Sequence, residues 1–144
     1  MNTFLRIGIA FVLGAILVSC KGPVELALRA NEDMNNDAAV RVVYVQLTNN
    51  ARFNQLTPVE FWANDNAALL GDLAAAKEEI RLSPGDTETI QVELAETTNF
   101  LGVAAGYSNP QSDGWRLSFP VGEIRGATIT VRLARDRLFV EEGR

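Results

Sequence analysis

Apolar and polar residues alternate over several short segments of this chain, which is the pattern of half-buried β-strands. Residues 24–30 alternate in this way, whereas residues 40–47 are apolar except for Arg41 and Gln46, as expected of a central strand packed on both faces. With the later segments of the same character, the pattern predicts about eight strands and an all-β sandwich. The later strands are expected at residues 78–82, 87–94, 100–108, 115–120, 127–134 and 138–142.

The strand pattern is interrupted by a segment with the signals of a short helix. Thr57 can cap this helix, Pro58 occupies the first helical position, and Glu60 completes a capping box. Residues 67–73 are predicted to add another helical turn or two. The sequence therefore predicts a small helical insertion in the sandwich.

Large apolar residues identify a candidate core. Trp115 begins a strand and precedes Arg116, a pair that could stack on a ligand, but a tryptophan at this position of a sandwich is more often a core residue. The same holds for Phe61 and Trp62 in the helical insertion, which we expect to clamp the helix onto a sheet. The strands add four further residues that we expect to be buried: Val43, Val45, Ile90 and Val92.

The N-terminal residues have the parts of a bacterial lipoprotein signal peptide. Arg6 supplies a positive charge, residues 7–18 are apolar apart from glycines, and the sole cysteine, Cys20, follows a small residue. An apolar run of about 12 residues is too short to span a bilayer, which needs about 20. We therefore expect residues 1–19 to be removed, Cys20 to be acylated, and residues 20–144 to form a lipid-anchored periplasmic domain.

Composition narrows the chemistry that this domain can carry out. The chain holds 18 acidic and 13 basic residues, a net charge of −5, which argues against nucleic acid as a partner. It contains no histidine and a single cysteine, so the sequence offers neither a Ser/His/Asp or Cys/His constellation nor a usual zinc site. We therefore predict that the protein is not an enzyme, has no metal site and carries no cofactor other than the covalent lipid on Cys20.

A polar loop is predicted between the first two strands, over residues 31–37. Its stretch from Asp33 to Asp37 superficially matches the start of a calcium loop. An EF-hand loop needs glycine at its sixth position and glutamate at its twelfth, but counting from Asp33 these positions hold Ala38 and Tyr44. An EF-hand loop is also flanked by helices, whereas strands are predicted on both sides of this one. We therefore expect a loop that presents side chains to a partner, and not a metal site.

Several residue blocks occur in a fixed order after the cysteine: residues 23–30, residues 40–47 with Phe53, Phe61, residues 69–73, Pro84-Gly85, residues 100–107 and Trp115-Arg116. Together with the lipidation motif at Cys20, this ordered set resembles the type VI secretion lipoproteins of the TssJ (SciN) family. Two departures lie at strand ends, where residues 36–39 replace a Gly-Arg-Pro-like segment and Ser108 stands where an arginine is common.

The resemblance implies a transthyretin-like β-sandwich with a helical insertion, anchored in the outer membrane and facing the periplasm. It implies a structural role, namely binding to the periplasmic C-terminal domain of the inner-membrane TssM (IcmF-like) protein, so that the complex bridges both membranes. In this family the loop between the first two strands carries much of the contact, which corresponds to residues 31–39 here. The partner-binding residues expected on this basis are Asn31, Glu32, Asp33, Met34, Asn35, Asn36 and Asp37.

Within this loop we expect Met34 to act as an apolar anchor and the acidic side chains to form a rim that faces a basic patch. If the interface lies elsewhere, the loops at residues 109–114 and 121–126 are the next candidates. Two other functions stay open at this point. The chain could be another assembly lipoprotein of an envelope machine, such as a secretin pilotin, or a hydrolase with a carboxylate pair, which would need two acidic side chains in one cleft.

Overall fold

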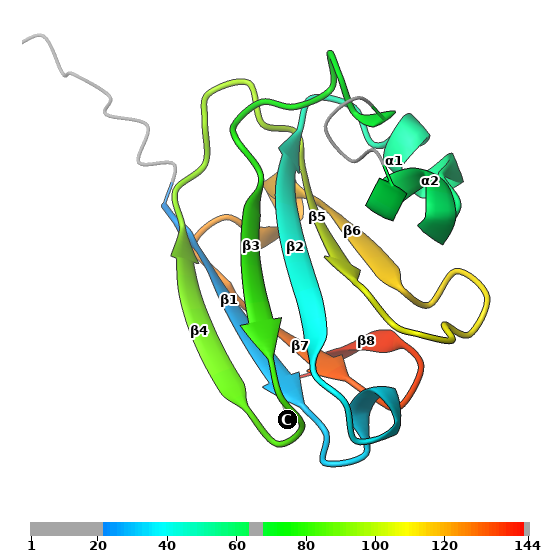
Figure 1. The fold of residues 1–144 in the computed structure, drawn as a ribbon. Coiled ribbons are helices and arrows are strands. Elements are labelled where there is room, and N and C mark those ends of the chain that lie inside the picture. Colours follow the sequence, from blue (N-terminus) through cyan, green and yellow to red (C-terminus); the bar gives the residue numbers. More distant parts are fainter. Residues whose placement is uncertain (1–21, 64–67, 143–144) are drawn as a thin grey trace, which may run out of the picture.

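The computed structural model describes residues 22–63 and 68–142, which form a sandwich of two four-stranded sheets (Figure 1). Sheet A has the strand order β4-β1-β7-β8, and sheet B has the order β3-β2-β5-β6. The predicted β-sandwich is therefore confirmed, whereas the predicted signal peptide, residues 1–19, and Cys20 lie outside the described residues. The strands are β1 (Val24–Ala30), β2 (Val40–Leu47), β3 (Glu78–Leu82), β4 (Thr87–Val92), β5 (Phe100–Ala105), β6 (Arg116–Pro120), β7 (Thr128–Leu133) and β8 (Leu138–Glu141).

The central position predicted for residues 40–47 is confirmed, because β2 lies between β3 and β5. In sheet A, β1 pairs antiparallel with β4 and parallel with β7. Strand β4 ends at Val92, two residues earlier than predicted. The Gln46 side-chain oxygen accepts hydrogen bonds from the Ala95 N–H at 2.8 Å and the Thr98 hydroxyl at 2.7 Å, so the chain turns toward sheet B.

The α-helices among the described residues are α1 (Ala51–Gln55), α2 (Pro58–Ala63) and α4 (Val121–Ile124), and the loop predicted after β1 contains a single 3-10 turn, η1 (Met34–Asn36). The capping box predicted for α2 is confirmed: the Thr57 hydroxyl accepts from the Glu60 N–H at 3.2 Å, and the Glu60 carboxylate accepts from the Thr57 N–H at 2.8 Å. The prediction of a loop over residues 121–126 is wrong at its start. Val121 and Ile124 are buried there, and this burial favours a short helix over an exposed loop.

The segment after α2 also belongs to the helical insertion. Its predicted helical turn, residues 67–73, begins at a residue outside the described part of the chain. Farther on, the Asp72 N–H donates to the Leu69 carbonyl at 2.9 Å, and Leu73 forms a bridge with Leu47 at the end of β2. The insertion is thus tied to the end of sheet B.

Helices α1 and α2 pack against the outer face of sheet B through Phe53 and Phe61, which are buried in the core, and Figure 1 shows both helices on the β5–β6 side of this sheet. Gly102 of β5 leaves the space that Phe53 fills, since a Cβ at this position would lie 2.9 Å from Val45 Cγ2 and 3.0 Å from Phe53 Cζ. The Phe61 ring lies 6.0 Å from the Phe53 ring and 5.4 Å from the Trp115 ring. The predicted clamping of the helix onto a sheet by Phe61 is therefore confirmed.

The core prediction holds for four of its five strand positions. Val43, Val45, Val92 and Trp115 are buried. Ile90 is only half-buried, because β4 is an edge strand of sheet A and has neighbours on one side only. Hydrophobic burial in this sandwich is strongest in the two central strands of sheet B, β2 and β5, which are packed on both of their faces.

The topology gives the sandwich two distinct ends. One end holds the start of β1, the helical insertion and α4, while the other holds the loop of residues 31–39 and the turns at 83–86 and 134–137. The 7 residues of β1 separate the two ends by about 20 Å at 3.3 Å per residue. A feature at the start of β1 and a feature in the loop after β1 therefore point in opposite directions.

Candidate interaction surface

The loop of residues 31–39 is held by backbone hydrogen bonds to both neighbouring turns. The Asn31 N–H donates to the Leu133 carbonyl at 2.9 Å, and the Asn35 N–H donates to the Arg135 carbonyl at 2.8 Å. On the other side, the Gly85 N–H donates to the Asn31 carbonyl at 3.4 Å. The candidate surface is therefore composite and includes the β3–β4 and β7–β8 turns, which the sequence did not link to this loop.

Asn35 and Asn36 support the backbone conformation of this loop. Asn35, Asn36 and Asp37 have φ angles of 49°, 52° and 65°, which lie in the left-handed region that Asn and Asp tolerate better than most residues. The buried Asn35 side chain donates to the Ala39 carbonyl at 3.3 Å and accepts from the Ser108 N–H at 2.9 Å. Asn35 is thus a structural residue of the loop, and its side chain is not displayed to a partner.

Met34 is completely buried, at 0% exposure, and belongs to the hydrophobic core. The prediction that Met34 presents an apolar anchor to a partner is therefore wrong for this structure. A single large apolar residue in a polar loop gains more by filling the end of the core than by remaining in water. The loop folds over its own methionine and leaves a polar outer surface.

The other predicted loop residues remain accessible to different extents. Glu32, Asp33, Asn36 and Asp37 are exposed, and Asn31 is half-buried. The Asp33 carboxylate lies 3.9 Å from Nε of Arg135, so its charge is partly balanced within the same end of the molecule. The acidic side chains are exposed where the acidic rim was predicted, but the basic side chain of Arg135 lies beside them.

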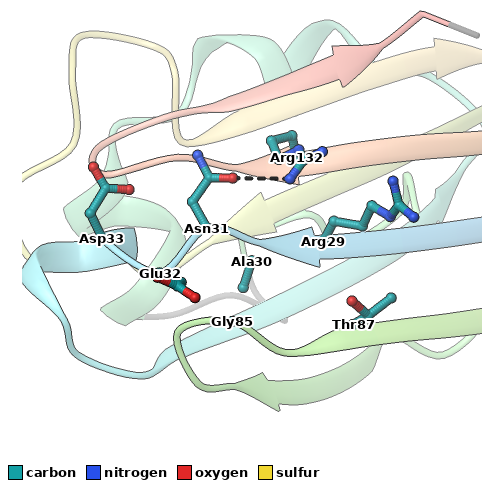
Figure 2. Close-up of a pocket in the computed structure, with 8 residues that line it drawn as sticks. All are labelled: Arg29, Ala30, Asn31, Glu32, Asp33, Gly85, Thr87 and Arg132. Atoms are coloured by element: carbon teal, nitrogen blue, oxygen red, sulfur yellow. Dashed lines mark hydrogen bonds between the residues drawn. The ribbon is translucent and has the colours of Figure 1, made fainter.

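A depression of about 560 Å³ adjoins the loop on the side of sheet A (Figure 2). Its walls come from the end of β1, the start of the loop, the β3–β4 turn, the start of β4, and β7. Three of its residues, Asn31, Glu32 and Asp33, were among those predicted to bind a partner, whereas its two arginines were not. The lining residues are Arg29, Ala30, Asn31, Glu32, Asp33, Gly85, Thr87 and Arg132.

The two arginines face each other across the parallel β1–β7 pair, where Arg29 is the register partner of Arg132. Arg132 donates to Glu141 Oε2 at 3.0 Å and to the side-chain oxygen of Asn31 at 3.3 Å, the contact drawn in Figure 2. Nη1 of Arg29 lies 3.6 Å from the same Glu141 oxygen. Two guanidinium groups thus converge on one carboxylate oxygen at the edge of the depression.

Tyr107 fastens the neighbouring turn to this end of the sandwich. Its hydroxyl donates to the Arg137 carbonyl at 2.9 Å, and burial raises the pKa of this phenol above its usual range, with the Asp136 charge adding to the effect. The group therefore stays a neutral donor, and this hydrogen bond joins the segment after β5 to the β7–β8 turn beside the candidate surface.

Trp115 and Arg116, the pair that could have stacked on a ligand, stabilise the fold. Trp115 is completely buried, and the Arg116 guanidinium lies 4.8 Å from the centre of its ring. Arg116 also donates to the Phe53 carbonyl at 2.9 Å and to the carbonyls of Leu56 and Asn54, which lie at and near the end of α1. The core interpretation of Trp115 is confirmed, and Arg116 fixes α1 to β6.

Within residues 22–63 and 68–142, no group of three or more His, Cys, Asp or Glu side chains is placed to hold a metal ion. No helix in the same ranges has the length and apolar character needed to cross a membrane.

Comparison with known proteins identifies a family. Residues 23–136 match the family model described as type VI secretion lipoprotein, VasD, EvfM, TssJ. No functionally curated protein matches the sequence.

Solved structures with the same fold come from the same secretion system. A chain of a structure titled "Type VI membrane complex" is 25% identical, with a TM-score of 0.76 and coverage of 84% of this chain and 98% of that chain. The lipoprotein TssJ1 from Pseudomonas aeruginosa is 22% identical, with a TM-score of 0.71 and coverage of 86% and 99%. A chain of a structure described as "T6SS protein TssM C-terminal domain (869-1107) from EAEC" is also 22% identical, with a TM-score of 0.74 and coverage of 84% of this chain and 98% of that chain.

Proposed function

The chain belongs to the family of type VI secretion lipoproteins, and we propose that it binds the periplasmic C-terminal domain of a TssM protein and thereby ties the secretion membrane complex to the outer membrane. The observation that carries this proposal is the family match over residues 23–136. The likeness to a chain from a type VI membrane complex, at 25% identity, supports it. The match also favours this function over that of a secretin pilotin.

The arrangement of the two ends of the sandwich supports the proposed attachment to the membrane through Cys20. The first described residue, Gly22, lies two positions after Cys20, the cysteine that we propose to be acylated. Such a short connection keeps the lipid near the start of β1, so the helical insertion and α4 are at the membrane end. The loop of residues 31–39 then lies about 20 Å farther into the periplasm, where an inner-membrane partner can reach it.

We propose a structural and not a catalytic role. The sequence lacks histidine, and its single cysteine is the proposed lipid attachment site. The acidic side chains of the loop differ from a catalytic carboxylate pair, because Glu32 and Asp33 are exposed on an open surface. The geometry is that of a rigid surface with charged groups, which suits recognition of another protein.

The anchor is tested with Cys20→Ser in a strain that lacks TssM. The expected result is that the variant moves from the outer-membrane fraction to the soluble periplasmic fraction, because the acyl chains that hold the protein at the membrane are missing. Sedimentation of this variant with outer membranes would contradict the lipid anchor. The melting temperature of the variant, compared with that of the wild type, controls for folding.

The partner surface is tested with the double variant Glu32→Lys and Asp33→Lys, which leaves Asp37 and its left-handed backbone unchanged. These changes keep Met34 and Asn35, which the fold needs, and reverse only exposed charges. Binding of the full-length lipoprotein in detergent to the TssM C-terminal domain should weaken by about tenfold or more, mostly through slower association.

Glu93→Lys combined with Glu96→Lys serves as the matched control, because both residues are exposed after β4, whose end pairs with the start of β1 at the opposite end of the sandwich. This control should leave the affinity for TssM unchanged within about twofold. Equal effects of the control and the double variant of the loop would place the contact away from the loop. Absence of wild-type binding would contradict the proposed partner itself.

A further inference from the structure

Stabilisation of the fold does not explain why two arginines, Arg29 and Arg132, lie side by side on neighbouring strands. The two residues are direct register partners on neighbouring parallel strands, a placement in which like charges repel. Glu141 contributes one negative charge to these two positive charges. These three residues carry one net positive charge. The depression is also lined by the exposed Glu32 and Asp33, and the Asp33 carboxylate lies 3.9 Å from Nε of Arg135.

The groups are placed to receive an anion from outside. The side chain of Arg29 is 50% exposed and that of Arg132 is 30% exposed, so both reach solvent. Arg132 is held in position by Glu141 and by the Asn31 side chain, whereas Arg29 approaches Glu141 only at 3.6 Å. A guanidinium group has five N–H donors in a fixed plane and binds a carboxylate through two of them.

The location of the pair links it to the candidate interface. Asn31 begins the loop of residues 31–39 and contacts Arg132, and the depression is lined by residues of both the loop and sheet A (Figure 2). Its volume of about 560 Å³ accommodates an inserted side chain from another protein. The surface of the loop thus continues without interruption onto the outer face of sheet A.

We propose that Arg29 and Arg132 form a receptor site for an Asp or Glu side chain of the TssM C-terminal domain, next to the contact made by the loop. This inference rests on the proposed function and adds the chemistry of recognition to it. Arg29 provides the accessible guanidinium, Arg132 provides the second positive charge, and Asn31 positions Arg132. The interface then combines acidic groups of the loop with a basic site beside them, and the partner carries the complementary pattern.

The experiment measures binding of the full-length lipoprotein in detergent to the TssM C-terminal domain for the wild type, Arg29→Glu, Arg29→Lys and Arg52→Glu. Arg52 is exposed on α1 at the opposite end, and Arg52→Glu changes the net charge by the same amount as Arg29→Glu. Arg29→Glu should weaken binding about tenfold or more, Arg29→Lys should retain much of the affinity, and Arg52→Glu should stay within about twofold. The dependence of affinity on salt should also be shallower for Arg29→Glu than for the wild type.

A charge exchange identifies the partner group. Among single Asp→Arg and Glu→Arg variants of the TssM domain, we expect one to bind Arg29→Glu at least about tenfold more tightly than it binds the wild-type lipoprotein. Wild-type binding combined with an unaffected Arg29→Glu variant would overturn the receptor site and leave the proposed function intact. Absence of wild-type binding would overturn both. Melting curves of all variants are compared, and Arg29→Gln replaces Arg29→Glu if the reversal unfolds the protein.

Discussion

The outer faces of the two sheets differ in what lies against them. Sheet B is covered by α1 and α2, so five consecutive residues of β5, Leu101 to Ala105, are buried. Sheet A has no such helical cover among the described residues, and β1 alternates between buried and accessible positions. The comparison shows that a strand's apolar pattern reports how many of its faces are packed.

The two outer faces also differ in what they contribute to the protein. The face of sheet B is filled with aromatic side chains and contributes to stability, whereas the face of sheet A carries threonines and charged groups that remain in contact with solvent. The depression with Arg29 and Arg132 lies on the second face. Substitutions should therefore affect stability strongly on the helix-covered face and weakly on the open one.

The largest effect is expected for Trp115→Ala. The substitution removes a completely buried indole that packs against Phe61, and such truncations cost about 3–5 kcal/mol. Urea denaturation of the wild type and the variant gives this difference. Trp115→Phe should cost clearly less, because it keeps a ring and removes an indole N–H that has no hydrogen-bond partner among the described residues. A cost below about 1 kcal/mol for Trp115→Ala would show that the helical cover contributes little.

Gly102→Ala should have the second largest effect, of about 1–3 kcal/mol, because its Cβ would lie 2.9 Å from Val45 and 3.0 Å from Phe53. Gly122→Ala on α4 is the matched control, since a Cβ there meets nothing within 4 Å. The two variants are compared by thermal melting. Equal melting temperatures would mean that α1 can move away from sheet B without loss.

Local sequence signals predicted much of the fold. The alternation over residues 24–30 and the capping residues Thr57 and Glu60 each depend on neighbours within a few positions, and the structure confirms both. The helix at 121–124 has only 4 residues, and its existence depends on burying Val121 and Ile124 against the sandwich. Such an element is decided by tertiary packing, which a local pattern does not report.

The candidate surface could be predicted only in part, for the same reason. The loop at residues 31–39 was evident from its polarity, but a lone methionine in it could equally face a partner or the core, and the structure buries Met34. The pairing of Arg29 with Arg132 depends on the parallel register of β1 and β7. These residues are far apart in sequence, so no spacing rule could bring them together.

Thr57→Ala tests how firmly α2 is fixed at its start. The variant loses the hydroxyl that accepts from the Glu60 N–H at 3.2 Å, and loss of such a cap costs about 1 kcal/mol. Urea denaturation should show this intermediate loss, between that of Gly102→Ala and that of a substitution at an exposed position on the outer face of sheet A. Thr57→Ser keeps the hydroxyl and should be close to the wild type. A Ser variant as unstable as the Ala variant would assign the loss to the methyl group and not to the cap.

The smallest effect is expected on the open face, for Thr89→Ala. Thr89 is exposed on the edge strand β4 and is the register partner of Ala27, so its removal exposes no core atom and leaves no buried polar group unpaired. Surface substitutions of this kind change stability by about 0.5 kcal/mol or less. Thr89→Ala should therefore have the wild-type denaturation midpoint and the wild-type affinity for the TssM domain, since Thr89 does not line the depression. Thr87→Ala, two residues away on the wall of the depression, provides the contrast: it should be equally stable but bind TssM a few-fold more weakly. If both variants lost stability like Gly102→Ala, the outer face of sheet A would be a packed surface, and the distinction between the two faces would fail.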